Sequence, residues 1–162
     1  MKFFPVPALL SAGLFILLAG CGPNYLLQKE YTLPDGNWTY DNPLVFEVDI
    51  EDTAPLYDIY LDLKHSPEFP MQNLYVQIQT GFPDGKSTSE LVSLELANNA
   101  GEWFGRCNSK TCTLRIPLQM GAFFNATGKH QITIEQYTRK EKLPGVQAVA
   151  LRIEQTDQTR SQ

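Results

Sequence analysis

Cys21 is the residue whose chemistry is most directly predicted by its neighbours. It follows a short apolar run over residues 9–18 and the small residues Ala19 and Gly20. A positive start, an apolar core and small residues at a cleavage site are the parts of a secretory signal peptide. A cysteine directly after Ala-Gly resembles a bacterial lipobox. We therefore expect residues 1–20 to be removed. Cys21 would then carry a diacylglyceryl group on its thiol and an acyl chain, such as palmitate, on its new amino terminus.

Two other interpretations of this segment are an ordinary signal peptide with a chance cysteine and a membrane-spanning helix. The apolar run is about ten residues long, whereas a spanning helix needs roughly 20. Several acyl chains, at about 0.8 kcal/mol per buried methylene, anchor a protein stably. The lipobox interpretation therefore predicts a mature chain that works tethered to a membrane surface through Cys21.

Cys107 and Cys112 are the remaining cysteines, and the four residues between them read as a tight turn. Export places the chain in an oxidising compartment, so we expect a disulfide that clamps a hairpin. Free thiols and a metal site are the alternatives. A metal site needs four ligands, and the other nitrogen candidates, His65 and His130, lie far apart in sequence.

No recognisable catalytic motif accompanies these residues. A nucleophilic serine or cysteine needs a positioned base, and neither histidine lies in such a motif. His65, directly before Ser66-Pro67, reads as an exposed loop histidine. Asp58 and Asp62 could act as a pair of carboxylates in glycoside hydrolysis, although solvated acids on an outer strand face are more common. The sequence predicts neither an enzyme nor a cofactor.

Several aromatic side chains could instead form a binding surface, by stacking on a sugar or anchoring a protein partner. Each could equally fill the core, because Trp and Phe usually bury their large apolar area. The candidates for a binding surface are Trp38, Tyr40, Trp103 and Tyr137, with Phe104 as a further aromatic residue to consider.

The charge of the mature chain excludes two classes of partner. The chain has 13 Lys and Arg against 18 Asp and Glu, and the signal peptide holds one of the lysines. The mature chain is therefore acidic. Nucleic acid requires a basic patch, and electrostatic binding to anionic lipid requires juxtamembrane basic clusters. We expect neither.

Alternating apolar and polar residues predict strands along most of the chain. Turn signals rich in Gly, Pro and Asn separate them, and only residues 118–124 suggest a short helix. About eight strands at this spacing predict an all-β fold, an antiparallel two-sheet β-sandwich with a jelly roll as one arrangement. The predicted strands cover residues 44–50, 58–64, 74–79, 92–96, 103–107, 111–116, 129–138 and 146–155.

These patterns divide the chain into four parts. Residues 1–20 are the predicted signal peptide, and residues 21–37, with little periodicity, read as a lipid-anchored tether. The β-sandwich domain is predicted over residues 38–156, followed by a polar tail over 157–162.

Three stretches, in this order behind a lipobox, resemble the GldH family of gliding-motility-associated lipoproteins from Bacteroidetes-type bacteria. The resemblance covers roughly residues 38–154, and it departs from the expected pattern at Tyr75 (tryptophan expected), at Lys64 (arginine expected) and in having the cysteine pair. The stretches are residues 73–76 after Lys64-His65 and Phe69-Pro70, residues 101–105, and residues 134–154.

The resemblance implies a role in gliding and the envelope machinery that supports it, with no catalytic residues. Together with the lipobox it implies a non-catalytic interaction or scaffold component whose partners are other envelope, gliding or secretion proteins. A carbohydrate-binding envelope lipoprotein is the alternative function.

The residues after Cys21 predict where the anchor is placed. Residues 22–25 lack the aspartate that retains lipoproteins in the inner membrane of enteric-type bacteria. They also lack the acidic cluster that exports lipoproteins to the cell surface in Bacteroidetes-type bacteria. We therefore expect anchoring in the outer membrane with the domain facing the periplasm.

Overall fold

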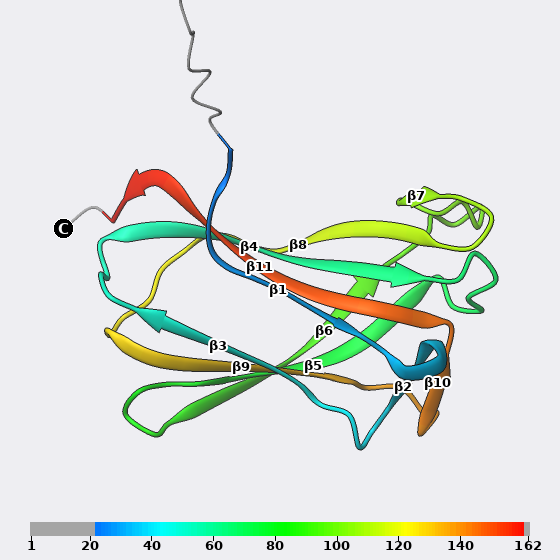
Figure 1. Cartoon of the computed structure of the whole chain (residues 1–162), viewed down its shortest axis with the longest axis horizontal. Coiled ribbons are helices and arrows are strands. Elements are labelled where there is room, and N and C mark those ends of the chain that lie inside the picture. Colours follow the sequence, from blue (N-terminus) through cyan, green and yellow to red (C-terminus); the bar gives the residue numbers. More distant parts are fainter. Residues whose placement is uncertain (1–21, 161–162) are drawn as a thin grey trace, which may run out of the picture.

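The computed structural model describes residues 22–160, so the predicted signal peptide and Cys21 lie outside the described residues. Strands dominate this part of the chain, with one short 3-10 helix (Figure 1). No helix in it is long and apolar enough to cross a membrane. The elements are β1 (Asn24–Thr32), η1 (Pro34–Gly36), β2 (Asn37–Thr39), β3 (Leu44–Ile50), β4 (Pro55–His65), β5 (Asn73–Gly81), β6 (Ser87–Glu95), β7 (Arg106–Cys107), β8 (Cys112–Ala122), β9 (Gly128–Gln136), β10 (Lys142–Pro144) and β11 (Val146–Thr159).

The eight long strands form two antiparallel sheets packed face to face. The first sheet has the order β1-β11-β4-β8 with the short β7 at its edge, and the second has the order β3-β9-β5-β6. The pairs are nested: β1 pairs with β11, β3 with β9, β4 with β8, and β5 with β6. Rolling such a nested set into two sheets gives a jelly roll. The predicted all-β sandwich is confirmed, and its strand order is that of the jelly roll.

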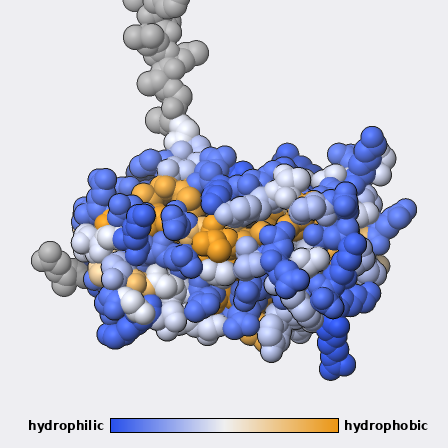
Figure 2. Space-filling model, turned by 60° about the horizontal axis from the view of Figure 1, so that its bottom comes forward, coloured by the Kyte–Doolittle hydropathy of each residue, from blue (hydrophilic) through white to orange (hydrophobic). Residues whose placement is uncertain are grey.

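One face of each strand forms a single core between the sheets. In β3, Leu44, Phe46, Val48 and Ile50 are buried, while Glu47 and Asp49 are exposed, as the alternating pattern predicts. On the face visible in Figure 2 the surface is mostly hydrophilic, with apolar surface gathered at the upper left and across the centre.

The predicted tether over residues 21–37 is wrong for most of its length. Residues Asn24–Thr32 form β1, which pairs with β11 as an integral strand of the first sheet. The register shifts between Tyr25 and Leu27, which marks a β-bulge, and an extra residue interrupts the period-two pattern. The sequence therefore shows no clear alternation here. At the other end, β11 continues to Thr159, beyond the predicted boundary at residue 156.

Two smaller predictions also change. The short helix predicted over residues 118–124 is wrong, because β8 continues as a strand to Ala122. The strand predicted over 103–107 shortens to Arg106–Cys107, while Trp103 makes an isolated bridge to Ala97. The disulfide is confirmed: Cys107 and Cys112 are bonded and face each other across the β7–β8 hairpin.

A charge cluster on the outer face of the first sheet ties four of its strands together. Asp62 of β4 accepts hydrogen bonds from Arg115 of β8, at 2.7 and 2.9 Å, and from Arg152 of β11. Arg115 also donates to the hydroxyl of Tyr25 in β1, at 3.4 Å. Burial by itself raises the pKa of Asp62, but the hydrogen bonds from the two guanidinium groups outweigh it and hold this pKa below the usual carboxyl value.

We predict that Asp62→Asn lowers the free energy of unfolding by about 3 kcal/mol, because it leaves two guanidinium groups without their nearly buried counter-charge. Glu30→Gln is the matched control. Glu30 pairs with Lys64 on the same sheet at 2.9 Å, but both side chains are over one third exposed, so the expected loss is below about 1 kcal/mol. Urea unfolding at neutral pH would measure both, and equal losses would contradict the prediction.

The same cluster sets a pH dependence. Because the pKa of Asp62 is lower in the folded state than its ordinary value of 3.8, the stabilisation is complete above that value. It is lost as the pH falls from there through the folded-state pKa. The stability difference between the wild type and Asp62→Asn should therefore shrink in that acidic range.

Candidate functional site

The four aromatic residues predicted as a binding surface lie in different environments. Trp38 is fully buried, so its assignment to a binding surface is wrong. It lies in β2, pairs with Leu143 of β10, and donates from its indole nitrogen to the carbonyl of Asn42 at 3.1 Å. The short β2–β10 pair covers one end of the core, and Trp38 is part of that cover.

Trp103 is half-buried and contributes mainly to packing. Its indole nitrogen donates to the carbonyl of Pro67 at 3.2 Å, and its ring meets the ring of His65 edge-on at 4.5 Å. His65 is completely buried, so the prediction of an exposed loop histidine is wrong. Burial lowers the pKa of His65, an effect that its hydrogen bond with the carbonyl of Ser66 partly opposes.

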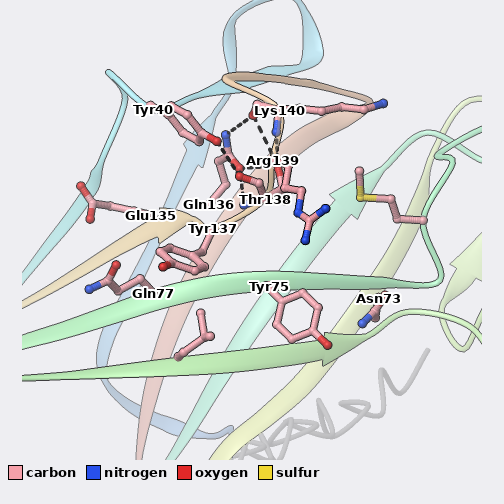
Figure 3. A pocket seen from close by; sticks show the side chains of 12 residues that line it. Tyr40, Asn73, Tyr75, Gln77, Glu135, Gln136, Tyr137, Thr138, Arg139 and Lys140 are labelled. Carbon is pink, nitrogen blue, oxygen red and sulfur yellow. Dashed lines mark hydrogen bonds between the residues drawn. The ribbon is translucent and has the colours of Figure 1, made fainter.

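Tyr40 and Tyr137 remain exposed, and the structure brings them together with Tyr75 around one open groove of about 1050 Å³. The exposed fractions of these three side chains are 45%, 57% and 44%. Figure 3 shows the groove, with the side chain of Arg139 above the rings of Tyr137 and Tyr75 in this view. We call this the tyrosine groove. It is lined by Tyr40, Met71, Asn73, Tyr75, Gln77, Leu91, Glu135, Gln136, Tyr137, Thr138, Arg139 and Lys140.

The floor of the tyrosine groove is the outer face of the second sheet. Tyr75 and Gln77 alternate with the buried Leu74 and Val76 along β5, so both side chains leave the sheet on its solvent side. Leu91 of β6 lies opposite Gln77 in the register and adds an exposed apolar surface. The sequence analysis did not predict Tyr75 as a site residue. Its two signals were its position on the polar face of the strand pattern and the aromatic residue that the family resemblance expects there.

The upper wall is the loop that follows β9. The backbone nitrogen of Tyr137 donates to the carbonyl of Tyr75 at 2.8 Å, which joins this wall to the floor. Tyr40, just after β2, donates from its hydroxyl to the carbonyl of Thr138. Residues almost one hundred positions apart are therefore fixed beside one another by a side-chain hydrogen bond.

Gln136 holds this loop in shape from below. It is 3% exposed, and its amide nitrogen donates to the carbonyl of Lys140 at 2.8 Å. Its amide oxygen accepts from both the backbone nitrogen and the hydroxyl of Thr138, at 3.0 and 2.8 Å (Figure 3). The hydrogen bonds of this one buried amide, which include a longer one to the carbonyl of Glu141 at 3.4 Å, pre-organise the wall, so a ligand would not have to order it.

The groove offers stacking surfaces and hydrogen-bonding groups of mixed charge. Glu135 supplies a carboxylate, Arg139 and Lys140 supply positive charges, and Asn73 and Gln77 supply amides. In residues 22–160 none of the three charged groups takes part in an ion pair. The arrangement suits binding through aromatic contact and hydrogen bonds.

The predicted carboxylate pair lies on the other sheet, away from this groove. Asp62 is held by two arginines, and Asp58 accepts a hydrogen bond from the backbone nitrogen of Gly121 at 2.9 Å. Neither lines the tyrosine groove. The part of the chain that the structure describes also has no cluster of three His, Cys, Asp or Glu side chains suited to a metal ion.

Comparison with known proteins identifies the family. The sequence model of the GldH lipoprotein family matches residues 25–153, which include both sheets and the tyrosine groove. The chain belongs to the GldH lipoprotein family. The resemblance inferred from the sequence is thereby confirmed, and family membership makes the chain a membrane-anchored lipoprotein of the cell envelope.

Two relatives match over 149 residues. A gliding motility lipoprotein GldH homolog of Christiangramia forsetii is 24% identical, over 88% of this chain and 91% of its own length. The gliding motility lipoprotein GldH of Flavobacterium johnsoniae is 27% identical, over 88% of this chain and 92% of its own. Neither name refers to a reaction.

Solved structures give only distant likenesses. An exo-β-1,3-galactanase from Phanerochaete chrysosporium has a TM-score of 0.36 at 9% identity, over 76% of this chain and 26% of that chain. CBM35 from Cellvibrio japonicus Abf62 has a TM-score of 0.29 at 16% identity, over 81% of this chain and 87% of that chain.

We predict that Gln136→Ala loosens the wall of the tyrosine groove. The change leaves backbone groups of Thr138 and Lys140 without their buried partner, at an expected cost of about 1–3 kcal/mol. Hydrogen exchange at the amide of Thr138 should accelerate. Gln77→Ala is the control, because the amide of Gln77 bonds Ser89 on the exposed face and surface changes usually stay within about 0.5 kcal/mol. Unchanged exchange at Thr138 in the Gln136 variant would contradict the role of this amide.

Proposed function

We propose that this lipoprotein is a non-catalytic binding component of the envelope machinery associated with gliding, anchored through Cys21. Three lines support the proposal. The chain belongs to the GldH lipoprotein family, two relatives over most of its length are named gliding motility lipoproteins, and the described domain presents a built groove without a catalytic arrangement beside it. Other proteins of the envelope, gliding or secretion apparatus would be its partners.

The exposure of Tyr75 and Tyr137 is the single observation that carries a binding role. Two large aromatic side chains face solvent: Tyr75 on the floor of the groove, and Tyr137 on a wall that a buried glutamine and backbone hydrogen bonds hold rigid. The core does not need them, because each sheet already buries its own apolar face. Exposed tyrosines beside an arginine form the kind of surface that dominates protein recognition.

The anchor would lie in the outer membrane, with the domain in the periplasm. This part of the proposal rests on the residues that follow Cys21, since residues 22–25 contain no acidic side chain. Neither the inner-membrane retention signal nor the surface-export signal is present.

A carbohydrate is the second candidate ligand, and the polar lining of the groove favours it. Asn73 and Gln77 are amides that both donate and accept, as sugar hydroxyls do, and they flank the ring of Tyr75. Aromatic faces with amides around them can stack on and hydrogen-bond a glycan. A protein partner and a glycan are therefore alternative ligands for the same groove, and the experiment below distinguishes them.

We predict that Tyr75→Ala and Tyr137→Ala each lower recovery of the native partner at least tenfold, since a central aromatic contact contributes roughly 2 kcal/mol or more. Phe104→Ala is the matched control, because Phe104 is 55% exposed but does not line the tyrosine groove. Affinity capture from crosslinked envelopes would measure the effect, with melting curves to confirm that each variant is folded.

The outcomes of this capture experiment separate the candidates. An envelope protein that is captured by the wild type and the Phe104 variant, and lost with the tyrosine variants, supports the proposal. Capture of peptidoglycan or another envelope glycan with the same dependence would replace it by the carbohydrate function. Equal recovery with all variants, or no envelope component above background, would overturn the role of the groove.

We predict that protease added to intact cells leaves the protein uncut, whereas the same protease degrades it after the outer membrane is permeabilised. A periplasmic domain is shielded by the outer membrane until that step. Immunoblotting would measure the remaining protein, with a known surface-exposed protein as the positive control. Cleavage in intact cells would refute the orientation.

A further inference from the structure

The first strand begins almost at the proposed lipid anchor. Only Gly22 and Pro23 separate Cys21 from Asn24, the first residue of β1. A fully extended chain advances at most about 3.6 Å per residue, so these three steps span only about 11 Å. If Cys21 is acylated, as proposed above, the start of β1 must lie within that distance of the bilayer.

Strand pairing defines which end of the sandwich this places at the membrane. Asn24 pairs with Gln155 of β11, Gln155 pairs with Tyr57 of β4, and Tyr57 pairs with Ala122 of β8. These four residues form one row across the first sheet. Neighbouring strands lie about 4.8 Å apart, so the row is about 14 Å wide. We call the residues within three positions of this row, and those beyond it, the anchor end, which lies opposite the β2–β10 end in Figure 1.

The anchor end exposes large apolar side chains. Met120 lies two residues before Ala122 and Phe123 directly after it, and they are 55% and 49% exposed. The guanidinium group of Arg160, at the end of β11, lies 4.2 Å from the centre of the Phe123 ring. Leu26 and Leu27 of β1 are partly buried and pack against the core. Exposed aromatic and long apolar side chains are favourable at the boundary between lipid head groups and acyl chains.

Charge indicates which lipid this end can approach. Asp52 and Asp58 flank the start of β4, and Asp157 lies near the end of β11. Arg160, whose guanidinium group lies over the ring of Phe123, supplies a positive charge beside these three acids. An acidic rim is repelled by anionic lipid, whereas zwitterionic head groups carry no net charge and tolerate it.

We propose that the anchor end is a membrane-contact surface, in which Met120 and Phe123 meet a zwitterionic phospholipid leaflet beside the acylated Cys21. The tyrosine groove lies toward the other end, because its Tyr40 and residues 137–140 adjoin the β2–β10 pair. Contact at the anchor end therefore turns the groove away from the anchoring leaflet, toward the periplasmic space.

Nitroxide labels on the full acylated lipoprotein in phosphatidylethanolamine–phosphatidylcholine bilayers would test this. Cys107 and Cys112 are bonded to each other and acylation blocks Cys21, so an introduced cysteine supplies the free thiol. Labels at Met120→Cys and Phe123→Cys should collide several-fold more with oxygen dissolved in lipid, and less with an aqueous nickel chelate, than a label at Tyr137→Cys. Equal water accessibility at all three positions would overturn the proposal.

A variant with a longer linker tests whether the short connection to Cys21 causes the membrane contact. Inserting about 20 glycine and serine residues between Pro23 and Asn24 allows the domain to move roughly 25 Å from the anchor. If the short link enforces contact, the label at Phe123 should become markedly more accessible to the nickel chelate. No change on insertion would show that the link does not position this end, and would count against the proposal.

Mass spectrometry of the amino-terminal peptide separates failure of this inference from failure of the anchor. An acylated Cys21 with water-exposed labels overturns the membrane contact and leaves the anchor intact. An unmodified Cys21 overturns the anchor, and the membrane contact with it. Contact that appears only after phosphatidylglycerol is added would overturn the choice of a zwitterionic surface.

Discussion

Strand β1 pairs with β11 from Asn24 to Thr32, so the first and last strands of the domain lie side by side. Because β11 also pairs with β4, and β4 with β8, the amino-terminal segment is fixed to the whole first sheet. The hydrogen bond from Arg115 to Tyr25 and the contacts of both arginines with Asp62 support this arrangement on the solvent side. A lipid attached at Cys21 would therefore be connected to the folded domain through only Gly22 and Pro23.

The same nested pairing separates the two ends of the molecule. The strand ends near Asn24 belong to the anchor end, while the connections that carry Tyr40 and Tyr137 lie toward the opposite end (Figure 1). Because the paired strands make the sandwich rigid, the tyrosine groove stays at a fixed distance from the anchor end. The buried amide of Gln136 extends the rigidity into the loop that forms the groove wall.

The tyrosine groove has the features that the proposed binding role requires. Its aromatic side chains are exposed, its charges are unpaired within the described residues, and its backbone is held by the hydrogen bonds of Gln136, Tyr40 and Tyr75. The acids that could suggest glycoside hydrolysis belong to the other sheet, where Asp62 has a structural task between two arginines. This distribution agrees with a family of lipoproteins whose names refer to motility.

The sequence alone determined the fold class, because a half-buried strand repeats every two residues and β3 shows that repeat without interruption. It also determined the disulfide, since Cys107 and Cys112 lie close enough along the chain for a tight turn to join them. The family resemblance followed from the order of short stretches, and the family match confirmed it. These features are local or are carried by the linear order of residues.

Only the tertiary structure decided which aromatic side chains are exposed and that the first strand of the domain begins at Asn24. Trp38 and Tyr40 are two residues apart, yet one is buried under the β2–β10 pair and the other is exposed. The partnership of Tyr75 with Tyr137 depends on a backbone hydrogen bond across 62 positions, which no local pattern records. The strand status of β1 was hidden by a bulge and became evident only through its distant partner β11. Local periodicity reports which face of a strand is buried, whereas long-range pairing decides which faces meet.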